Sequence, residues 1–419
     1  MSPTKSDLLG AVRLASDGVC GVTGVVEAVH QRIAAPGRTR TSREGRAGGI
    51  SGLVYSAIRG ITRSIGAGAS GAVSLLLEDD GNAGQGRQRE AIIAALNGVL
   101  GDHLAATGNP LTTTMEFRHG GQPLTLERTA LKAELPQAGE QLLVLIHGLC
   151  MNDLQWRRGD HDHGAAIAAE FGFTPIYLRY NSGLRIEDNG RTLAEAMERL
   201  IGAWPRRVGR LAMLCHSMGG LVARSAWHQA VQQGMAWPSR LDDLVFLGTP
   251  HFGAPLEQIG HLLDITLQGL PYAAPLARLS RLRSAGITDL RHGNVLAPDS
   301  ATGECVPVPL PQGVRCRAVA ALLGKQGGRV KSRVGDGLVP LNSALGRHSD
   351  ATRSLAFAAQ SQYVASETGH LDLLASGHVY AKLRTWFAAA PVDADAVPRD
   401  AATGTSRSIA WPARRPARP

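Results

Sequence analysis

The chain has 419 residues, of which 44% are apolar and 19% are charged, and this balance excludes a wholly disordered protein. Its formal net charge of +9 raises nucleic acids and anionic membranes as partners. However, aromatic residues make up only 5%, and no basic run alternates with aromatic side chains as a base-stacking surface requires, so we expect no nucleic-acid partner.

The five cysteines are too few for a disulfide framework in a chain of this length. Cys305 and Cys316 flank a proline-rich stretch and could pair in an oxidising compartment, but reduced thiols in a cytoplasm are the favoured interpretation. The apolar start at residues 8–12 is broken by Arg13 and Asp17, so it does not predict a signal peptide. We therefore expect a cytoplasmic protein, with peripheral membrane contact as the alternative.

Residues 1–110 are predicted to form a helical N-terminal extension with a flexible basic linker. The uncharged span 64–77 has 14 residues, short of the roughly 20 that a membrane-spanning helix needs. Two alternatives remain for these helices: an amphipathic segment on a membrane surface, or packing on the catalytic domain. Packing is favoured, because the polar face carries few Lys and Arg residues. The last of these helices is expected to begin at about Glu90.

From residue 112 the apolar spacing changes to that of strands. Met115 and Phe117 alternate with polar neighbours before a Gly120-Gly121 turn, which predicts a β-hairpin. Six short apolar runs follow and alternate with helical patterns: 142–146, 176–180, 211–214, 244–247, 318–323 and 356–365. Continuous runs indicate strands buried on both faces, hence a parallel sheet with helices on each side. We predict an eight-stranded, mostly parallel α/β sheet in a domain spanning residues 111–390, followed by a disordered tail at 391–419.

The strongest chemical signal lies in the sequence L-A-M-L-C-H-S-M-G-G at residues 211–220. A buried strand ends there, a tight turn presents Ser217, and a helix opens from Leu221. A serine hydroxyl needs a base within hydrogen-bond reach and an unhindered approach. Gly219 and Gly220 let the helix pass close to the strand, and the helix N-terminus points backbone N–H groups at the site.

This corner resembles the nucleophile elbow of the α/β-hydrolases, whose pattern is G-x-S-x-G. Here Cys215 replaces the first glycine, so a Cβ and a sulfur must fit where the family usually has none. Cys215 is a poor candidate for the nucleophile because it ends the buried strand, two residues before the tip of the turn. The resemblance also implies an oxyanion hole made by the backbone N–H groups of Leu149 and Met218, with His147 supporting the loop.

The acid and the base are expected later in the chain, in the order Ser, Asp, His. Asp336 lies in V-G-D-G-L-V-P after the 318–323 strand, and similar loops carry the acid in many lipases and esterases. Asp264 and Asp350 are weaker candidates. His370 follows the final strand in E-T-G-H-L-D-L-L and is the expected base.

The other histidines have less specific interpretations. His378 is expected to lie within a helix and to face away from the site. His161 and His163, in D-H-D-H, suggest a metal, but such a pair on a polar loop is more typical of a solvated surface. No cysteine or histidine spacing forms a structural zinc site, and we expect no metal and no cofactor.

Over about residues 140–387 the sequence is similar to bacterial lipase-like serine esterases related to the GPI inositol-deacylase group. The likeness is carried by L-C-M-N-D-L-Q-W (149–156), Y-N-S-G (180–183), N-G-R (189–191), T-P-H-F-G (249–253) and S-A-G-I-T-D-L-R (284–291). It implies an α/β-hydrolase fold with a helical cap or lid at residues 254–310, for which ordinary covering of the sheet is the alternative.

The expected function is hydrolysis of carboxylic esters, lipid-like or hydrophobic, through an acyl-enzyme on Ser217. Asp336 would orient His370 and stabilise its positive form. Two alternatives remain. One is acyl transfer by the same triad to an acceptor other than water, and the other is a catalytically decayed module that binds a membrane or a protein.

Overall fold

The computed structural model describes residues 83–255, 284–324 and 335–389. The predicted helices before residue 83, the tail from 391 and the central part of the expected cap therefore lie outside the described residues, as does Asp264. No helix among the described residues is long and apolar enough to cross a membrane.

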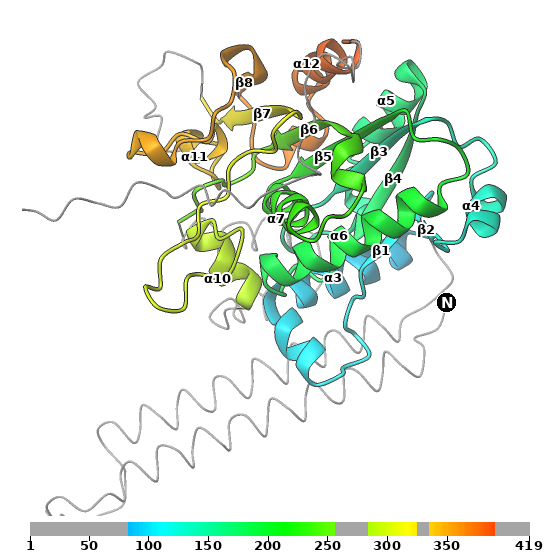
Figure 1. Cartoon of the computed structure of the whole chain (residues 1–419), viewed down its shortest axis with the longest axis horizontal. Coiled ribbons are helices and arrows are strands. Elements are labelled where there is room, and N and C mark those ends of the chain that lie inside the picture. Colours follow the sequence, from blue (N-terminus) through cyan, green and yellow to red (C-terminus); the bar gives the residue numbers. More distant parts are fainter. Residues whose placement is uncertain (1–82, 256–283, 325–334, 390–419) are drawn as a thin grey trace, which may run out of the picture.

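In the described part of the chain, eight strands form one central sheet (Figure 1). Its strand order is β2-β1-β4-β3-β5-β6-β7-β8. Strand β1 is antiparallel to both β2 and β4, and the remaining pairs are parallel. The strands are β1 (Glu116–His119), β2 (Gln122–Pro123), β3 (Gln141–Ile146), β4 (Phe173–Arg179), β5 (Arg210–His216), β6 (Leu241–Leu247), β7 (Arg315–Leu322) and β8 (Gln362–Ser366). The predicted hairpin and six parallel strands are confirmed.

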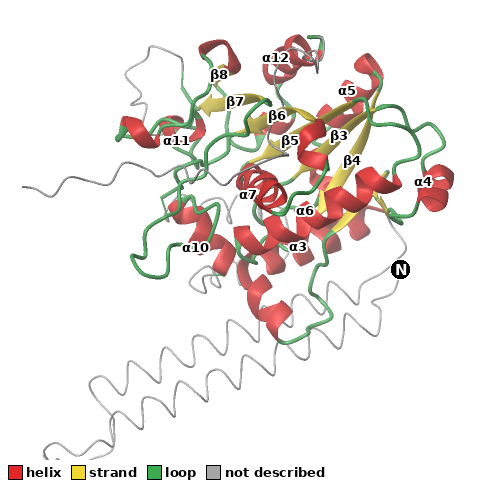
Figure 2. Ribbon diagram, viewed as in Figure 1, coloured by secondary structure: helices red, strands yellow, loops and turns green. Residues whose placement is uncertain are grey.

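Helices cover both faces of the sheet (Figure 2). The α-helices are α3 (Ala83–Ala106), α4 (Arg128–Glu134), α5 (His163–Phe171), α6 (Ile186–Ala203), α7 (Met218–Gln232), α10 (Ala285–His292), α11 (Leu341–Ala344) and α12 (Gly377–Phe387). One core lies between the sheet and α3, α6 and α7, and the other lies between the sheet and α5 and α12. In β3, Val144 faces the first core and Leu145 the second, which is why the strand sequence is continuously apolar.

Helix α3 packs into the first core and begins seven residues before the predicted Glu90. A Cβ at Gly98 would clash with the Cys150 sulfur, and one at Gly101 would clash with the Asn181 side chain. The Asn181 amide donates to the Gly101 carbonyl oxygen at 2.9 Å. Helix α3 lies directly against the loops that follow β3 and β4. The segment at residues 64–77, for which membrane contact and packing are the alternatives, lies outside the described residues.

The segments that carry the family likeness hold one another in place around α3. The Ser284 hydroxyl donates to the Gly98 carbonyl at 2.7 Å. Asp289, in α10, accepts a hydrogen bond from the Ile186 N–H at 3.1 Å. The Cys150 N–H donates to the Ser182 hydroxyl at 3.0 Å. These hydrogen bonds hold the loop after β3 in place, and this loop carries Leu149, one of the two predicted oxyanion donors.

Two boundaries near the C-terminal end differ from the prediction. Strand β8 begins at Gln362, and the predicted first part of that strand is a loop ending in a 3₁₀ turn, η5 (Ala359–Ser361). Ala356 and Ala358 are exposed, so the apolar run there does not reflect burial. His370 is followed by a second 3₁₀ turn, η6 (Asp372–Leu374), and the helix begins only at Gly377.

Candidate active site

Ser217 stands at the corner between β5 and α7 with φ 53° and ψ −126°, a left-handed conformation that a residue with a Cβ rarely adopts. Its N–H donates to the Leu247 carbonyl at 2.8 Å, which ties the corner to the end of β6. A Cβ on Gly219 would clash with the carbonyl oxygen of Ile146, and one on Gly220 with the Thr249 side chain. The two glycines therefore allow the helix to approach the strands, as predicted from the sequence.

Cys215 lies in the middle of the sheet, in β5 between β3 and β6. Its side chain is fully buried in the core formed with α3, α6 and α7. The Cβ and sulfur at this position are thus accommodated by packing. Burial raises the pKa of the Cys215 thiol well above its usual value, so the nucleophilic thiolate is disfavoured.

The structure brings Asp336 and His370 together although 34 residues separate them. His370 Nδ1 lies 2.7 Å from Asp336 Oδ2, and each residue is only 3% exposed. The other carboxylate oxygen, Oδ1, accepts the N–H groups of Leu338 at 2.9 Å and Val339 at 2.7 Å. The carboxylate is therefore held by its own loop and accepts a hydrogen bond from the N–H group at His370 Nδ1. In this tautomer Nε2 is an acceptor.

His370 lies at the same edge of the sheet as Ser217. A Cβ on Gly248 would meet the His370 ring atoms Cε1 and Nδ1 at 3.1 Å, and Gly248 directly follows the residue that accepts the Ser217 N–H. His370 Nε2 is buried and has no hydrogen-bond partner among the described residues, so it makes no hydrogen bond with the serine hydroxyl. A hydrogen bond between a serine and a neighbouring histidine at such a site is often long in the absence of a ligand.

The expected oxyanion donors lie on either side of the serine corner. A Cβ on Gly148 would meet the Ser217 Cβ at 2.9 Å, so the loop that continues to Leu149 lies against the serine. Met218 is the first residue of α7, whose first N–H groups have no partner within the helix. In the described part of the chain, neither the Leu149 nor the Met218 N–H donates a hydrogen bond.

His147 supports the loop after β3. Its ring stacks on Tyr180 with 4.3 Å between centroids, its Nδ1 lies 2.8 Å from the Gly148 carbonyl oxygen, and its own carbonyl accepts the Tyr180 hydroxyl at 2.9 Å. Burial lowers the pKa of His147 to about 4, so the imidazole is neutral at pH 7. These contacts match the supporting role that the sequence suggested.

His216, the residue before the serine, was missed by the sequence analysis. Its Nε2 lies 3.2 Å from the His370 carbonyl oxygen, and the two rings are 4.7 Å apart. Burial, and next the nearby His370, lower the pKa of His216 well below its usual value. The neutral ring therefore donates from Nε2 to the loop that carries His370. The only signal in the sequence was a histidine adjacent to the serine.

The remaining candidates lie away from this group. Asp350 is an exposed N-cap of a 3₁₀ turn, η4 (Ala351–Arg353), and His378 is exposed on α12. The expectation of a solvated pair at His161 and His163 was wrong for His163. That ring is fully buried, with Nδ1 2.7 Å from His161 Nε2 and Nε2 2.9 Å from the Leu373 carbonyl oxygen.

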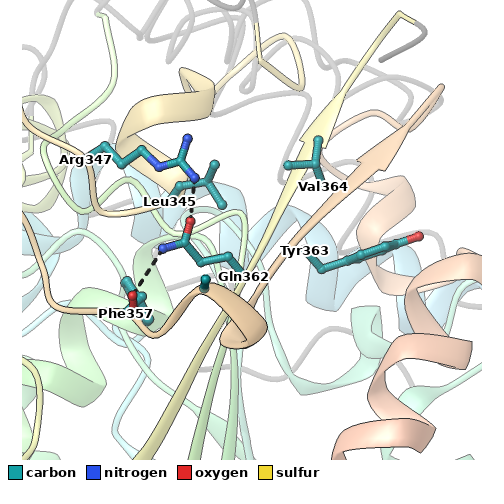
Figure 3. A pocket seen from close by; sticks show the side chains of 7 residues that line it. Leu345, Arg347, Phe357, Gln362, Tyr363 and Val364 are labelled. Atoms are coloured by element: carbon teal, nitrogen blue, oxygen red, sulfur yellow. Dashed lines mark hydrogen bonds between the residues drawn. The ribbon is translucent and has the colours of Figure 1, made fainter. Parts of the chain in front are cut away.

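Two cavities among the described residues lie outside this site, and none of Ser217, Asp336 and His370 lines either of them. One has a volume of about 450 Å³ and lies at the edge strand β8, where Arg347 donates to the Gln362 side chain at 2.7 Å (Figure 3). The other has a volume of about 580 Å³ and lies near the start of β7.

The sequence matches the family model of the PGAP1-like alpha/beta domain over residues 177–302, a range that includes Ser217 and ends before Asp336. A comparison with curated proteins found no match. Among solved structures, the lipase BlEst2 of Bacillus licheniformis in its mature form is similar at 18% identity, with 59% of this chain and 91% of that chain covered and a TM-score of 0.40.

A thermophilic esterase from Thermogutta terrifontis is similar at 15% identity, with 60% of this chain and 90% of that chain covered and a TM-score of 0.36. At such scores the likeness supports no conclusion about activity. The strand order and the strained serine corner of this chain agree independently with the family match. The chain has the α/β-hydrolase fold.

Proposed function

We propose that the protein hydrolyses carboxylic esters through an acyl-enzyme on Ser217. The observation that carries the proposal is the buried contact of 2.7 Å between His370 Nδ1 and Asp336 Oδ2, at the sheet edge where Ser217 is held in a strained turn. A carboxylate in this position holds the imidazole in the tautomer whose Nε2 can accept a proton.

In the proposed reaction, His370 Nε2 takes the proton of the Ser217 hydroxyl as the oxygen attacks the ester carbonyl carbon. The N–H groups of Leu149 and Met218 would bind the resulting oxyanion, and each such donor typically contributes about 3 kcal/mol to transition-state stabilisation. The imidazolium then gives its proton to the leaving alcohol. Water, deprotonated by the same Nε2, attacks the acyl-enzyme and releases the acid and the free serine.

The substrate class is proposed to be lipid-like or otherwise hydrophobic esters. This part rests on the apolar positions at helical spacing in residues 254–310 of the sequence, which predict a cap. A series of p-nitrophenyl esters with acyl chains of increasing length tests it. We expect kcat/KM to rise from acetate to octanoate, and a steady fall along the series would reject a hydrophobic acyl group.

The nucleophile is tested with a fluorophosphonate probe and with Ser217→Ala. We expect one adduct per chain, located at Ser217 by mass spectrometry, and a loss of turnover of about 10⁴-fold or more in the variant. Cys215→Ala serves as the matched control and should keep its probe adduct. Turnover by Ser217→Ala within tenfold of wild type would reject the proposal. Adding alcohols and measuring new esters distinguishes acyl transfer from hydrolysis.

A further inference from the structure

Three residues other than glycine have a positive φ in the described part of the chain: Cys150, Ser217 and Glu367. All three stand beside the candidate active site. Ser217 is the proposed nucleophile, and Glu367 lies three residues before His370. Cys150, with φ 60°, directly follows the proposed oxyanion donor Leu149. Residues with a Cβ rarely adopt this conformation unless the surrounding structure imposes it, and such residues cluster at functional sites.

Helix α3 holds the Cys150 side chain. This residue is fully buried, and a Cβ on Gly98 would overlap its sulfur and lie 3.0 Å from its N and Cα atoms. The loop after β3 therefore touches the helix at a position where the helix has no side chain. The Cys150 thiol donates to the Ala95 carbonyl oxygen at 3.8 Å. Burial raises the pKa of this thiol, so it stays protonated at neutral pH and acts by packing.

The same loop is attached to α3 a second time, at Asn152. The Asn152 amide donates to the Glu90 carbonyl oxygen in α3 at 3.0 Å. Its side-chain oxygen accepts the Leu154 N–H at 3.0 Å, which fixes the orientation of the amide. On its other side the loop is held by the hydrogen bond from the Cys150 N–H to the Ser182 hydroxyl. The loop thus has two attachments to α3 within three residues.

Leu149 lies between these attachments and the nucleophile. A Cβ on Gly148 would meet the Ser217 Cβ at 2.9 Å, so the residue before Leu149 touches the serine corner, and the residue after it is seated on α3. Because each peptide group is planar, a displacement of Cys150 turns the peptide groups that join it to Gly148. An oxyanion donor must lie about 3 Å from the developing charge, so such a turn matters for catalysis.

We propose that α3, through the contact of Gly98 with Cys150, positions the Leu149 N–H for the oxyanion. Gly98 and Cys150 are then positioning residues, and α3 belongs to the framework of the active site although it precedes the sheet in the chain. This role rests on the proposed ester hydrolysis, whereas the attachment of the loop to α3 does not.

Gly98→Ala tests the proposal, with Gly202→Ala in α6 as the matched control, because a Cβ at Gly202 meets no atom within 4 Å. We expect kcat of Gly98→Ala on a short p-nitrophenyl ester to fall at least about tenfold with KM nearly unchanged, since an oxyanion donor acts in the transition state. Inhibition by a trifluoromethyl ketone, which forms a tetrahedral anion on the serine, should weaken by the same factor. Wild-type kcat in a folded Gly98→Ala would overturn the proposal.

The double variant Gly98→Ala/Cys150→Gly tests whether the two residues act through one contact. Glycine adopts φ 60° without strain and leaves room for the added methyl group. We expect Cys150→Gly alone to lower kcat, because the loop loses its anchor, and the double variant to be more active than Gly98→Ala. A double variant whose loss is the product of the two single losses would show independent action and contradict the proposal. If the thermal midpoint shows that Gly98→Ala does not fold, Cys150→Gly decides, and wild-type kcat there would refute the role.

Amide hydrogen exchange separates the attachment of the loop from ester hydrolysis. The peptide covering residues 147–152 should exchange faster in Gly98→Ala than in wild type or Gly202→Ala, and more slowly again in the double variant. Wild type without turnover and without a fluorophosphonate adduct would reject hydrolysis, and with it the catalytic role of α3, while the exchange rates would still report the attachment. Equal exchange in wild type and Gly98→Ala would show that α3 does not hold the loop.

Discussion

The Nε2 atom of His216 lies 3.2 Å from the carbonyl oxygen of His370, so the residue before the proposed nucleophile contacts the backbone of the proposed base. The two residues are 154 positions apart in the chain. This hydrogen bond links the serine corner to the loop after β8, and it does so through a ring that burial keeps neutral.

We expect His216→Phe to lower kcat by about tenfold to a hundredfold, because it leaves the buried His370 carbonyl without its donor, a loss of about 1–3 kcal/mol. KM should change little, since His216 has no proposed contact with substrate. His216→Gln keeps an N–H donor and should recover part of the lost rate. His378→Phe, at an exposed site on α12, serves as the control. Equal rates for the Phe and Gln variants would contradict a role for this hydrogen bond.

Asp336→Asn tests the orienting role of the carboxylate. The amide can present an N–H group toward His370 Nδ1, which favours the tautomer with the proton on Nε2 and blocks proton removal from Ser217. We expect kcat to fall by about 10⁴-fold while circular dichroism and the thermal midpoint stay close to wild type. Asp350→Asn removes the alternative acid, an exposed cap, and should leave kcat unchanged. If kcat fell further in Asp350→Asn than in Asp336→Asn, Asp350 would be the acid that orients His370.

The sequence predicted the central strands well because they are buried on both faces. The apolar run of β5 is continuous, and every residue in Arg210–His216 is buried. The serine corner was also predictable, since its two glycines are needed where α7 crosses the strands. The start of β8 was misplaced because Ala356 and Ala358 count as apolar in a sequence pattern but are exposed in the structure.

Contacts between distant segments could not be derived from local spacing. The burial of His163 depends on the Leu373 carbonyl, 210 residues later, and on Tyr380, whose ring stacks on it at 5.8 Å. The same holds for the Asp336–His370 contact, for which the sequence supplied only the order of the residue types. The packing of α12 on α5 brings the Tyr380 ring against the His163 ring, and no pattern within either helix indicates this contact.

Buried histidines make the folded state sensitive to acid. Burial lowers the pKa of His163 to about 4, whereas an unfolded histidine titrates near 6.5. Between these values the unfolded chain binds a proton that the folded chain does not, so the free energy of unfolding falls as pH drops. For His163 alone the loss is about 2 kcal/mol at pH 5 compared with pH 8.

Urea unfolding of His163→Gln at pH 8 and pH 5 checks this. Glutamine can still donate to the Leu373 carbonyl and accept from His161 but takes up no proton, so we expect the variant to lose less stability between the two pH values than wild type. His378→Gln is the control for an exposed histidine and should show the wild-type difference. An identical pH dependence in His163→Gln and wild type would mean that another group governs the acid sensitivity.

The serine corner also allows a prediction about backbone packing. A Cβ at Gly219 would clash with the carbonyl oxygens of Ile146 and His147, and backbone atoms cannot move aside cheaply. We expect Gly219→Ala to destabilise the fold by about 1–3 kcal/mol and to shift Ser217 away from the loop after β3, which lowers kcat as well. Gly202→Ala is the matched control, because Gly202 lies in α6 with open space around its Cβ position.

Alanine at Gly202 should raise the free energy of unfolding by about 0.5–1 kcal/mol, since alanine restricts the unfolded chain more than glycine and favours helix. The two variants thus make the same chemical change in two helices with opposite expected signs. Chemical denaturation of both measures the difference. If Gly219→Ala were as stable as Gly202→Ala, α7 would not need its close approach to the strands, and the strained conformation of Ser217 would have to arise from another contact.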